Sequence, residues 1–437
     1  MDSGKGAARP NAAAAVTPAG AGSSRKRFMV VAGVFALSWI LYIDRAAISS
    51  AKGPIASELG LSDQAMGLVF SAFVLGYALM QIPAGRFADR WGPRIALAAM
   101  VASWSLFTFL TGTISSLGVL LVVRFLFGVA EAGAFPGSAR AFYNWLPPGE
   151  RGIANGILFS GAMIGGGVSF PICAWLLGAS GWRTTFYLLA IPGFLWALLW
   201  FVFFRDHPAR PVVQEVSGSA AGMSFGQVFR SGPMALAMIQ YFVGNFTFYI
   251  GVTWMLPYLT EHFKLSATEA ANYATAPLIC GAVANWTAGF IVDALYRSGH
   301  RAWSRRLPGV CGFLVAACGI YSVSLATSPL AAVVGFAVAI TGVELTISPS
   351  WAFCLDIGGK SSGGVTGAMN MVGNLGGFVS SNAFPLLNRL TGSANTYFYT
   401  AALLNLVGVA CWIWMKPRAA RSRRSQTNGS APRANSE

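Results

Sequence analysis

The sequence predicts an all-α membrane protein with twelve transmembrane helices in two halves of six. Three observations lead to this fold class. The 437 residues are 55% hydrophobic and only 10% charged, whereas soluble domains carry about 25% charged residues. The apolar residues fall into about twelve long runs separated by polar breaks. The longest internal polar break, 205–231, divides these runs into two equal sets.

Each apolar run approaches or exceeds the roughly 20 residues that a helix needs to cross a bilayer. The expected spans, in chain order, are 28–50, 65–86, 94–113, 117–141, 152–177, 183–204, 232–258, 268–296, 307–327, 330–356, 363–387 and 395–416. The sequence therefore divides into five expected parts. These are a disordered tail at 1–24, a first half at 25–204, a cytoplasmic linker at 205–231, a second half at 232–416 and a disordered basic tail at 417–437.

Basic residues gather on one side of the expected spans. That side holds most of the Arg and Lys, whereas the opposite side has only Lys52, Arg183, Lys264 and Arg389. The positive-inside rule then places both termini in the cytoplasm, which an even number of spans requires. This topology explains the net charge of +15 without a nucleic-acid partner. We expect a multi-pass protein of the bacterial inner membrane.

Several function classes lack their sequence signals. The six Cys lie within apolar runs and show no metal-like spacing, and the three His fall in predicted loops. No nucleophile constellation and no phosphate-binding glycine loop is present, and no segment is large enough for a soluble output domain. We therefore expect neither an enzyme nor a sensor, and no cofactor or metal.

Charged residues occur inside an apolar run, where they are costly. Arg124 and Glu131 lie well within 117–141, and a charge at that depth costs about 2.5–3.5 kcal/mol or more on insertion scales. Together with Gly128 they share one helix face, because they stand at i, i+4 and i+7. We expect this face to line a water-accessible cavity inside the helix bundle.

The two halves share a weak internal repeat. Gly85 and Asp89 follow the second expected span, and Gly289 and Asp293 follow the eighth with the same spacing. Repeated halves suggest a transporter that works by alternating access, with its substrate near the midplane.

The loop after the second span carries a family motif, Gly85-Arg-Phe-Ala-Asp89-Arg90-Trp-Gly92-Pro93-Arg94. It matches the loop motif of the major facilitator superfamily. Within that superfamily the chain resembles the anion:cation symporters, which include hexonate, hexuronate and phthalate-type carriers. The resemblance also rests on residues throughout 28–416, chiefly Tyr42-Ile-Asp44-Arg45, Tyr77, the run from Arg124 to Gly133, Asn144-Trp145, Asn245, Trp351, and Gly367 to Gly377.

This resemblance implies roles for individual residues. Arg45 and Arg124 would hold the substrate carboxylate, and Asp44 and Glu131 would take and release protons. Other residues would line the pocket, namely Tyr42, Tyr77, Trp351 and Asn374. A conformational latch that does not touch substrate would consist of Gly85, Asp89, Arg90 and Arg94.

Two points about the site stay open. Arg124 can neutralise Glu131 in the empty protein and release it when an anion arrives, so that Glu131 takes a proton. Glu344 shares a helix face with Ser348 and Trp351. We expect Ser348 to contact substrate, whereas Glu344 fits a proton site, a partner for Arg45 or Arg124, a contact for a substrate hydroxyl, or a structural acid.

The sequence thus predicts a monomeric, proton-coupled symporter that imports a small organic carboxylate. The fifth span lacks an amide side chain in the stretch 160–163, where several sugar-acid carriers of the family have Gln. An aromatic or dicarboxylic acid therefore rivals a sugar acid such as a hexonate or glucarate. An uncoupled facilitator or an anion exchanger is the alternative transport mode. A multidrug exporter fits less well, because two Arg share the cavity.

Overall fold

The computed structural model describes residues 21–208 and 224–415, and every regular element in these ranges is helical. The first half contains α1 (Ala21–Ser50), α2 (Lys52–Leu59), α3 (Asp63–Thr111), α4 (Leu117–Glu131), α5 (Ala134–Trp145) and α6 (Arg151–Phe203). The second half contains α7 (Phe225–Phe229), α8 (Gly232–Thr253), α9 (Met255–His262), α10 (Ala267–Arg297), α11 (Arg301–Ser324), α12 (Pro329–Gly358), α13 (Ser362–Thr391) and α14 (Asn395–Trp414).

The apolar runs form the long helices that the sequence predicts. Within the described ranges, nine helices are long and apolar enough to cross a membrane. Two of the longest are interrupted by a glycine, at Gly92 in α3 (φ 80°) and at Gly181 in α6 (φ 74°). Only glycine adopts such angles without a steric penalty. At Gly92 the following residue is Pro93, which favours a turn.

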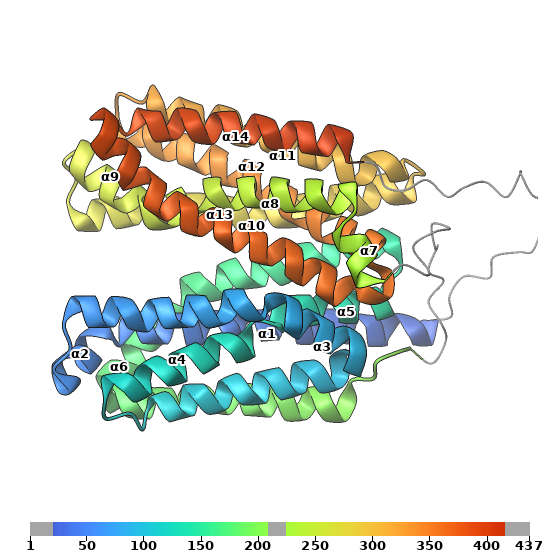
Figure 1. Ribbon diagram of the computed structural model, residues 1–437, viewed down its shortest axis with the longest axis horizontal. Helices are drawn as coiled ribbons and strands as arrows, with labels where there is room; N and C mark the ends of the chain where they lie inside the picture. Colours follow the sequence, from blue (N-terminus) through green and yellow to red (C-terminus); the bar gives the residue numbers. More distant parts are fainter. Residues whose placement is uncertain (1–20, 209–223, 416–437) are drawn as a thin grey trace, which may run out of the picture.

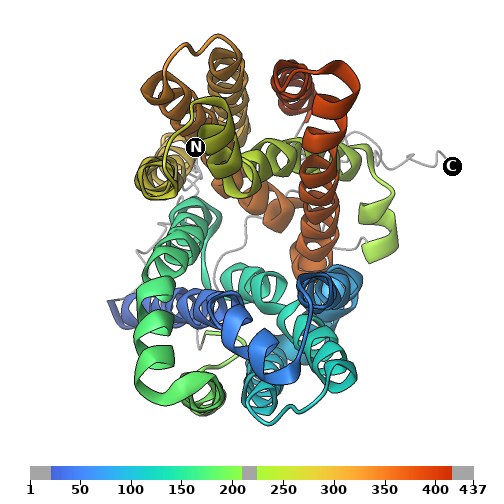
Figure 2. The same ribbon diagram turned by 90° about the vertical axis from the view of Figure 1, so that its left-hand side faces the viewer.

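The helices form two bundles that lie side by side. Figure 1 shows α1 to α6 in the lower bundle and α7 to α14 in the upper one. Figure 2, which looks along the long axis, shows the helices of the two bundles end on. The bundles meet where α3 packs against α13 and α6 against α10.

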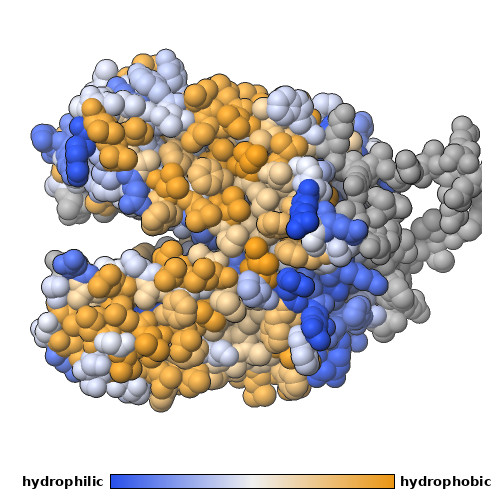
Figure 3. Space-filling model, in the orientation of Figure 1, coloured by the Kyte–Doolittle hydropathy of each residue, from blue (hydrophilic) through white to orange (hydrophobic). Residues whose placement is uncertain are grey.

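The hydrophobic core joins the two bundles at one end only. One large cluster includes buried side chains of both halves, such as Phe142 and Trp351. Two other clusters each belong to a single half, one around Phe186 and one around Phe398. Figure 3 shows a cleft between the halves at one end of the molecule, which is the end where α2 and α9 lie in Figure 1. We call this the open end, and the opposite end, where α5 and α7 lie, the closed end.

The outer surface carries an apolar belt. Figure 3 shows hydrophobic residues across the middle of both bundles and hydrophilic residues toward their ends. Exposed members of this belt include Leu79, Phe290, Phe378 and Leu403. Such a belt is the surface that a bilayer covers.

Some of the expected boundaries lie outside the described residues. This holds for 1–20 of the first tail, for 209–223 of the linker and for the whole second tail. Helix α1 begins at Ala21, within the expected tail. The described end of the linker contains the short helix α7, which starts with a capping box formed by Ser224 and Gln227.

Candidate functional site

An arginine and a glutamate meet between α1 and the end of α4. The Nε of Arg45 donates to Oε1 of Glu131 at 2.6 Å, and the Nη2 group pairs with the same oxygen. The Arg45 side chain is 25% exposed, whereas that of Glu131 is fully buried. The guanidinium therefore covers the acid, and part of the Arg45 side chain stays exposed.

Sequence spacing pointed to Arg124 as the partner of Glu131, but the ion pair in the structure is with Arg45. The reason is helix geometry. Seven residues along α4 separate Arg124 from Glu131 by about 10.5 Å of rise, two turns of helix. Helix α1 instead brings Arg45 alongside Glu131.

Arg124 lies deeper in the same half and packs on aromatic rings. It is 2% exposed, and among the described residues its Nε has no hydrogen-bond partner. Its guanidinium is 4.5 Å from the Phe127 centroid and 5.2 Å from that of Phe73. Arg45 lies at 5.2 Å from the same Phe73 ring. The two guanidinium groups thus share one aromatic ring, whose π-face stabilises both cations.

Asp44 points away from Arg45 and is buried behind the pair. It is 2% exposed, and within the described part of the chain neither carboxylate oxygen has a hydrogen bond of standard geometry. The Thr108 hydroxyl and the Trp104 indole face it from α3, and Arg124 and Glu131 are the charges nearest to it. A carboxylate in such surroundings is a good place to hold a proton.

Tyrosines from both halves surround the Arg45 side of the cleft. Arg45 lies 5.4 Å from the ring centroid of Tyr42 and 4.8 Å from that of Tyr77. From the second half, Tyr249 and Glu344 lie within electrostatic reach of Tyr42. The two halves therefore face one another across this group of aromatic rings.

Trp351 lies in an aromatic cluster that joins the halves. It is fully buried, and its indole donates to the Tyr241 hydroxyl at 2.9 Å. Its ring is 5.1 Å from Phe159 and 6.1 Å from Phe135, which belong to the first half. In this conformation Trp351 closes the contact between the halves.

Glu344 stands alone on α12 with an amide partner. Its Oε2 accepts a hydrogen bond from Asn285 of α10 at 2.6 Å, and the residue is 3% exposed. Ser348, one turn along α12, donates to the carbonyl of Gly152 at 3.0 Å. The Ser348 hydroxyl thus connects α12 to α6 in this conformation, while Glu344 does not pair with Arg45 or Arg124.

Two amides that sequence reasoning missed connect α13 to α3. Asn370 donates to Oε1 of Gln81 at 3.1 Å and lies 3.5 Å from the Tyr77 hydroxyl. The predicted residue Asn374 donates to the carbonyl of Asn370 at 2.8 Å. Gln81 lies one turn after Tyr77 within an apolar run, and this spacing is the signal that could have identified it.

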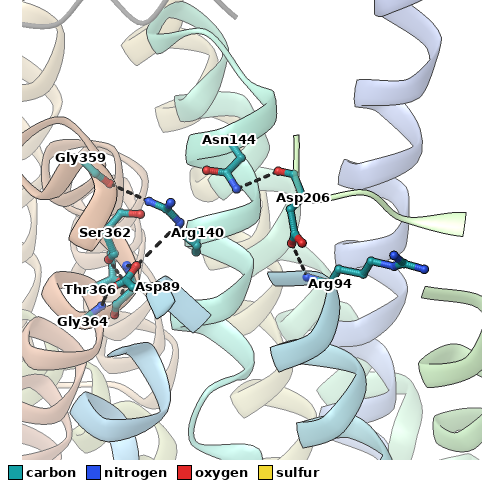
Figure 4. A network of polar contacts seen from close by, with 10 residues as sticks. Asp89, Arg94, Arg140, Asn144, Asp206, Gly359, Ser362, Gly364 and Thr366 are labelled. Carbon is teal, nitrogen blue, oxygen red and sulfur yellow. Dashed lines mark hydrogen bonds and ion pairs between the residues drawn. The ribbon is translucent and has the colours of Figure 1, made fainter. Parts of the chain in front are cut away.

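At the closed end an acid caps a helix of the other half. Asp89 accepts from the backbone N–H groups of Gly363 and Gly364 at 2.8 and 2.7 Å, at the start of α13 (Figure 4). Unpaired N–H groups and the helix dipole make this position favourable for an anion. Arg140 lies 3.9 Å from Asp89 and donates to the carbonyl of Gly359 at 3.3 Å.

The repeated motif makes the equivalent contact in the opposite direction. Asp293 of the second half accepts from the N–H groups of Gly152 and Ile153 at 2.9 and 2.7 Å, at the start of α6. Nearby, Asp356 pairs with Arg151 of the first half and with Arg305 of its own half, at 2.9 and 3.1 Å. The closed end is thus held by two acid-to-helix contacts and one shared ion pair.

The other predicted latch residues differ in their surroundings. Gly85 lies against α13 so closely that a Cβ would come within 2.2 Å of the Gly363 carbonyl oxygen. Arg94 stays within its own half, where its backbone N–H donates to Asp206 at 2.8 Å (Figure 4). Arg90 is exposed and forms no ion pair within the described ranges. The described residues contain no cluster of potential metal ligands.

Comparison with known proteins places this geometry in a family. The profile of the Major Facilitator Superfamily matches residues 34–381. A probable sulfoacetate transporter of Cupriavidus necator is 32% identical over 408 residues, covering 90% of this chain and 94% of that protein. The D-galactonate transporter of Escherichia coli O6:H1 is 28% identical over 415 residues, covering 89% and 95%.

Solved structures agree on the fold. The transporter FucP in its outward conformation superposes with a TM-score of 0.71 at 14% identity, covering 90% of this chain and 100% of that one. The human organic anion transporter MFSD10 gives a TM-score of 0.69 at 16% identity, covering 89% and 99%. At these identities the likeness concerns the fold alone.

Proposed function

The chain belongs to the Major Facilitator Superfamily, and we propose that it imports a small organic anion together with one or more protons. The proposed carrier spans the bacterial inner membrane twelve times and works as a monomer. The closed end, which holds the Arg-rich contacts, faces the cytoplasm, as do both termini. In this orientation the structure is open to the outside.

One observation carries this proposal, namely that the Arg45 side chain is partly exposed, at 25%, while that of its partner Glu131 is completely buried. The planar guanidinium binds a carboxylate or sulfonate with two parallel hydrogen bonds, a geometry that Lys does not offer. A second cation, Arg124, adds to the attraction for an anion.

The same pair supplies the coupling. An anion that binds Arg45 competes with Glu131 for the guanidinium. Glu131 then becomes a buried carboxylate without its cation, a state that is costly unless the group takes a proton. Substrate and proton therefore bind cooperatively, as symport requires. Asp44, which lies beside Thr108 and Trp104, is the second proton carrier.

The relatives support the substrate class. Their names describe carriers of sulfoacetate, galactonate, hexuronate, and galactarate or glucarate. All of these are small acids with a carboxylate or sulfonate group. We extend the class to this chain and include aromatic acids, because Tyr42 and Tyr77 offer ring surface beside Arg45.

We infer alternating access because one end of the molecule is open and the other is closed. Release to the cytoplasm requires that the contacts of Asp89, Asp293 and Asp356 break and that the halves close at the open end. These contacts lie at the closed end, opposite to the end where the cleft opens (Figure 3). They act on the conformational equilibrium without binding substrate.

Thermal stabilisation of the purified protein identifies the substrate. The panel contains sugar acids, sulfonates, dicarboxylates and aromatic acids. Each acid is tested at about pH 5.5 and 7.5, because carboxyl and imidazole groups are protonated to different extents at these two values. A stabilising acid is then followed into proteoliposomes, with and without an imposed pH gradient. Accumulation that needs an inward proton gradient supports symport. Exchange without accumulation contradicts it and leaves an uncoupled carrier or exchanger.

A further inference from the structure

Glu344 is a buried acid that lacks a cation. It is 3% exposed, and among the described residues only Asn285 forms a hydrogen bond with its carboxylate. Glu131, the buried acid of the other half, pairs with Arg45. An ionised carboxylate at membrane depth is costly, and acids in such positions are usually functional. The described residues therefore supply Glu344 with an amide but with no cation.

The surroundings hold the Glu344 carboxylate in one orientation. Asn285 of α10 donates its amide to Oε2, so this oxygen acts as an acceptor. Gly281, one turn earlier on α10, makes room for the side chain, because a Cβ there would lie 3.1 Å from Cγ of Glu344. Within the described chain, Oε1 receives no hydrogen bond. An ionised carboxylate has about four acceptor sites, so most of its capacity is unused.

Glu344 lies on α12 of the second half, whereas Arg45 lies on α1 of the first half. Tyr42 of the first half lies against the Arg45 guanidinium and also within electrostatic reach of Glu344. Tyr241 of the second half lies within electrostatic reach of both Glu344 and Tyr42. A small molecule bound at Arg45 and extending past Tyr42 thus meets an acid on the opposite wall.

We propose that Glu344 determines substrate specificity by accepting a hydrogen bond from a hydroxyl or ammonium group at the end of the substrate opposite to the anion held by Arg45. This inference rests on the proposed function. A donor at that end satisfies the free oxygen of Glu344, whereas a second carboxylate or sulfonate meets a like charge in a low-dielectric site. The carrier therefore selects monoanions with a distal donor over dianions of the same length.

Three matched pairs of acids test this, each differing only at the distal end. They are isethionate and sulfoacetate, D-galactonate and galactarate, and 4-hydroxybenzoate and terephthalate. Binding of each acid to the purified full-length protein is measured by calorimetry at about pH 8, where carboxylic acids are ionised in water. We expect the hydroxyl-ended member of any pair that binds to be at least about tenfold tighter, which is 1.4 kcal/mol.

The decisive variant is Glu344→Gln, which keeps the size and one acceptor but removes the charge. We expect the preference for the hydroxyl-ended acid to fall close to one, mainly because the dianion binds better. Glu344→Asp keeps the charge and shortens its reach, so it should still reject the dianion while binding the hydroxyl-ended acid more weakly. Glu269→Gln serves as a control, because Glu269 lies at the start of α10 and glutamine can preserve its capping box.

The outcomes separate this inference from the proposed function. An unchanged preference in Glu344→Gln, a wild-type preference for the dianions, or an equal loss of both members of a pair overturns the role of Glu344 alone. Failure of all three pairs to bind the wild-type protein overturns both proposals. The melting temperature of each variant, measured without ligand, verifies that it is folded.

Discussion

The two halves share a fold but differ in how they bury charge. The first half places two arginines beside Phe73 and buries two acids, Asp44 and Glu131, of which Glu131 is paired with Arg45. The second half places Glu344 beside a neutral amide instead of a cation. Equivalent scaffolds therefore carry different electrostatics.

This difference suggests a division of labour. Opposite charges that exchange partners can link an anion to a proton, and Arg45 and Glu131 of the first half are such a pair. An acid held by an amide has no cation to exchange, so it is suited to recognising the shape and polarity of the substrate. The closed end is the part where the halves are alike, since Asp89 and Asp293 make equivalent contacts in opposite directions.

Of the variants that test this difference between the halves, we expect Arg45→Ala to have the largest effect. Removal of the guanidinium deletes the anion contact and leaves Glu131 without its cation. We expect binding of any stabilising acid to weaken by 2 kcal/mol or more, about thirtyfold, measured by calorimetry. Arg389→Ala, at an exposed position on α13, is the control for loss of one positive charge. Retained affinity in Arg45→Ala would move the anion site to Arg124.

We expect the second largest effect in Glu131→Gln, which should lose the coupling of transport to protons. Glutamine keeps the volume and an acceptor for Arg45 but cannot take a proton. We expect exchange of substrate between two loaded compartments to continue, while accumulation driven by a pH gradient is abolished. Glu261→Gln, on the exposed surface of α9, should leave both activities intact. Accumulation that persists in Glu131→Gln would transfer the proton role to Asp44 or Glu344.

The variants Asp89→Asn and Asp293→Asn test whether the two acid-to-helix contacts contribute equally to keeping the closed end closed. Hydrogen bonds to a charged group contribute about 1.5–3 kcal/mol each, so either change should shift the equilibrium toward opening of this end by roughly tenfold or more. Spin labels at the exposed positions 90 and 360, in a variant lacking the six cysteines, report the distance between the halves. A shift in only one variant would show that the repeat is not functionally equivalent.

The smallest effect concerns a contact at the open end within the first half. Trp182 and Arg183 donate to Glu58 and lower the pKa of its carboxyl. Because the folded pKa is depressed, this stabilisation is present above the unfolded pKa and disappears as pH falls through the folded value. We expect Glu58→Gln to lower the melting temperature slightly at neutral pH and not at about pH 3, below the usual range for Glu. An equal loss at both pH values would contradict an electrostatic origin.

Much of the fold follows from the sequence, because apolar runs and glycine or proline turns are local signals. The run around Arg124 forms a helix, and the loop at Gly92 reverses the chain, as predicted. Partners across helices are not local. The pairing of Glu131 with Arg45 and of Glu344 with Asn285 depends on how α1 meets α4 and α10 meets α12.

Some contacts leave little trace in a single sequence. Asp89 binds backbone N–H groups of α13, and any residue could supply these groups. The bridge between Gln81 and Asn370 joins positions 289 residues apart. Trp351 was predicted to line the pocket, and its contact with Phe135 and Phe159 depends on the meeting of the two halves. Whether substrate reaches Trp351 or Asn374 stays a prediction.

The central claim is that an anion at Arg45 releases Glu131 to take a proton. Calorimetric titration of the purified protein, in buffers with different heats of ionisation, counts the protons taken up as substrate binds. We predict net proton uptake near neutral pH for the wild-type protein with the best-binding acid, and a clear loss of that uptake in Glu131→Gln. Tight binding by the wild-type protein without any proton uptake would contradict the account.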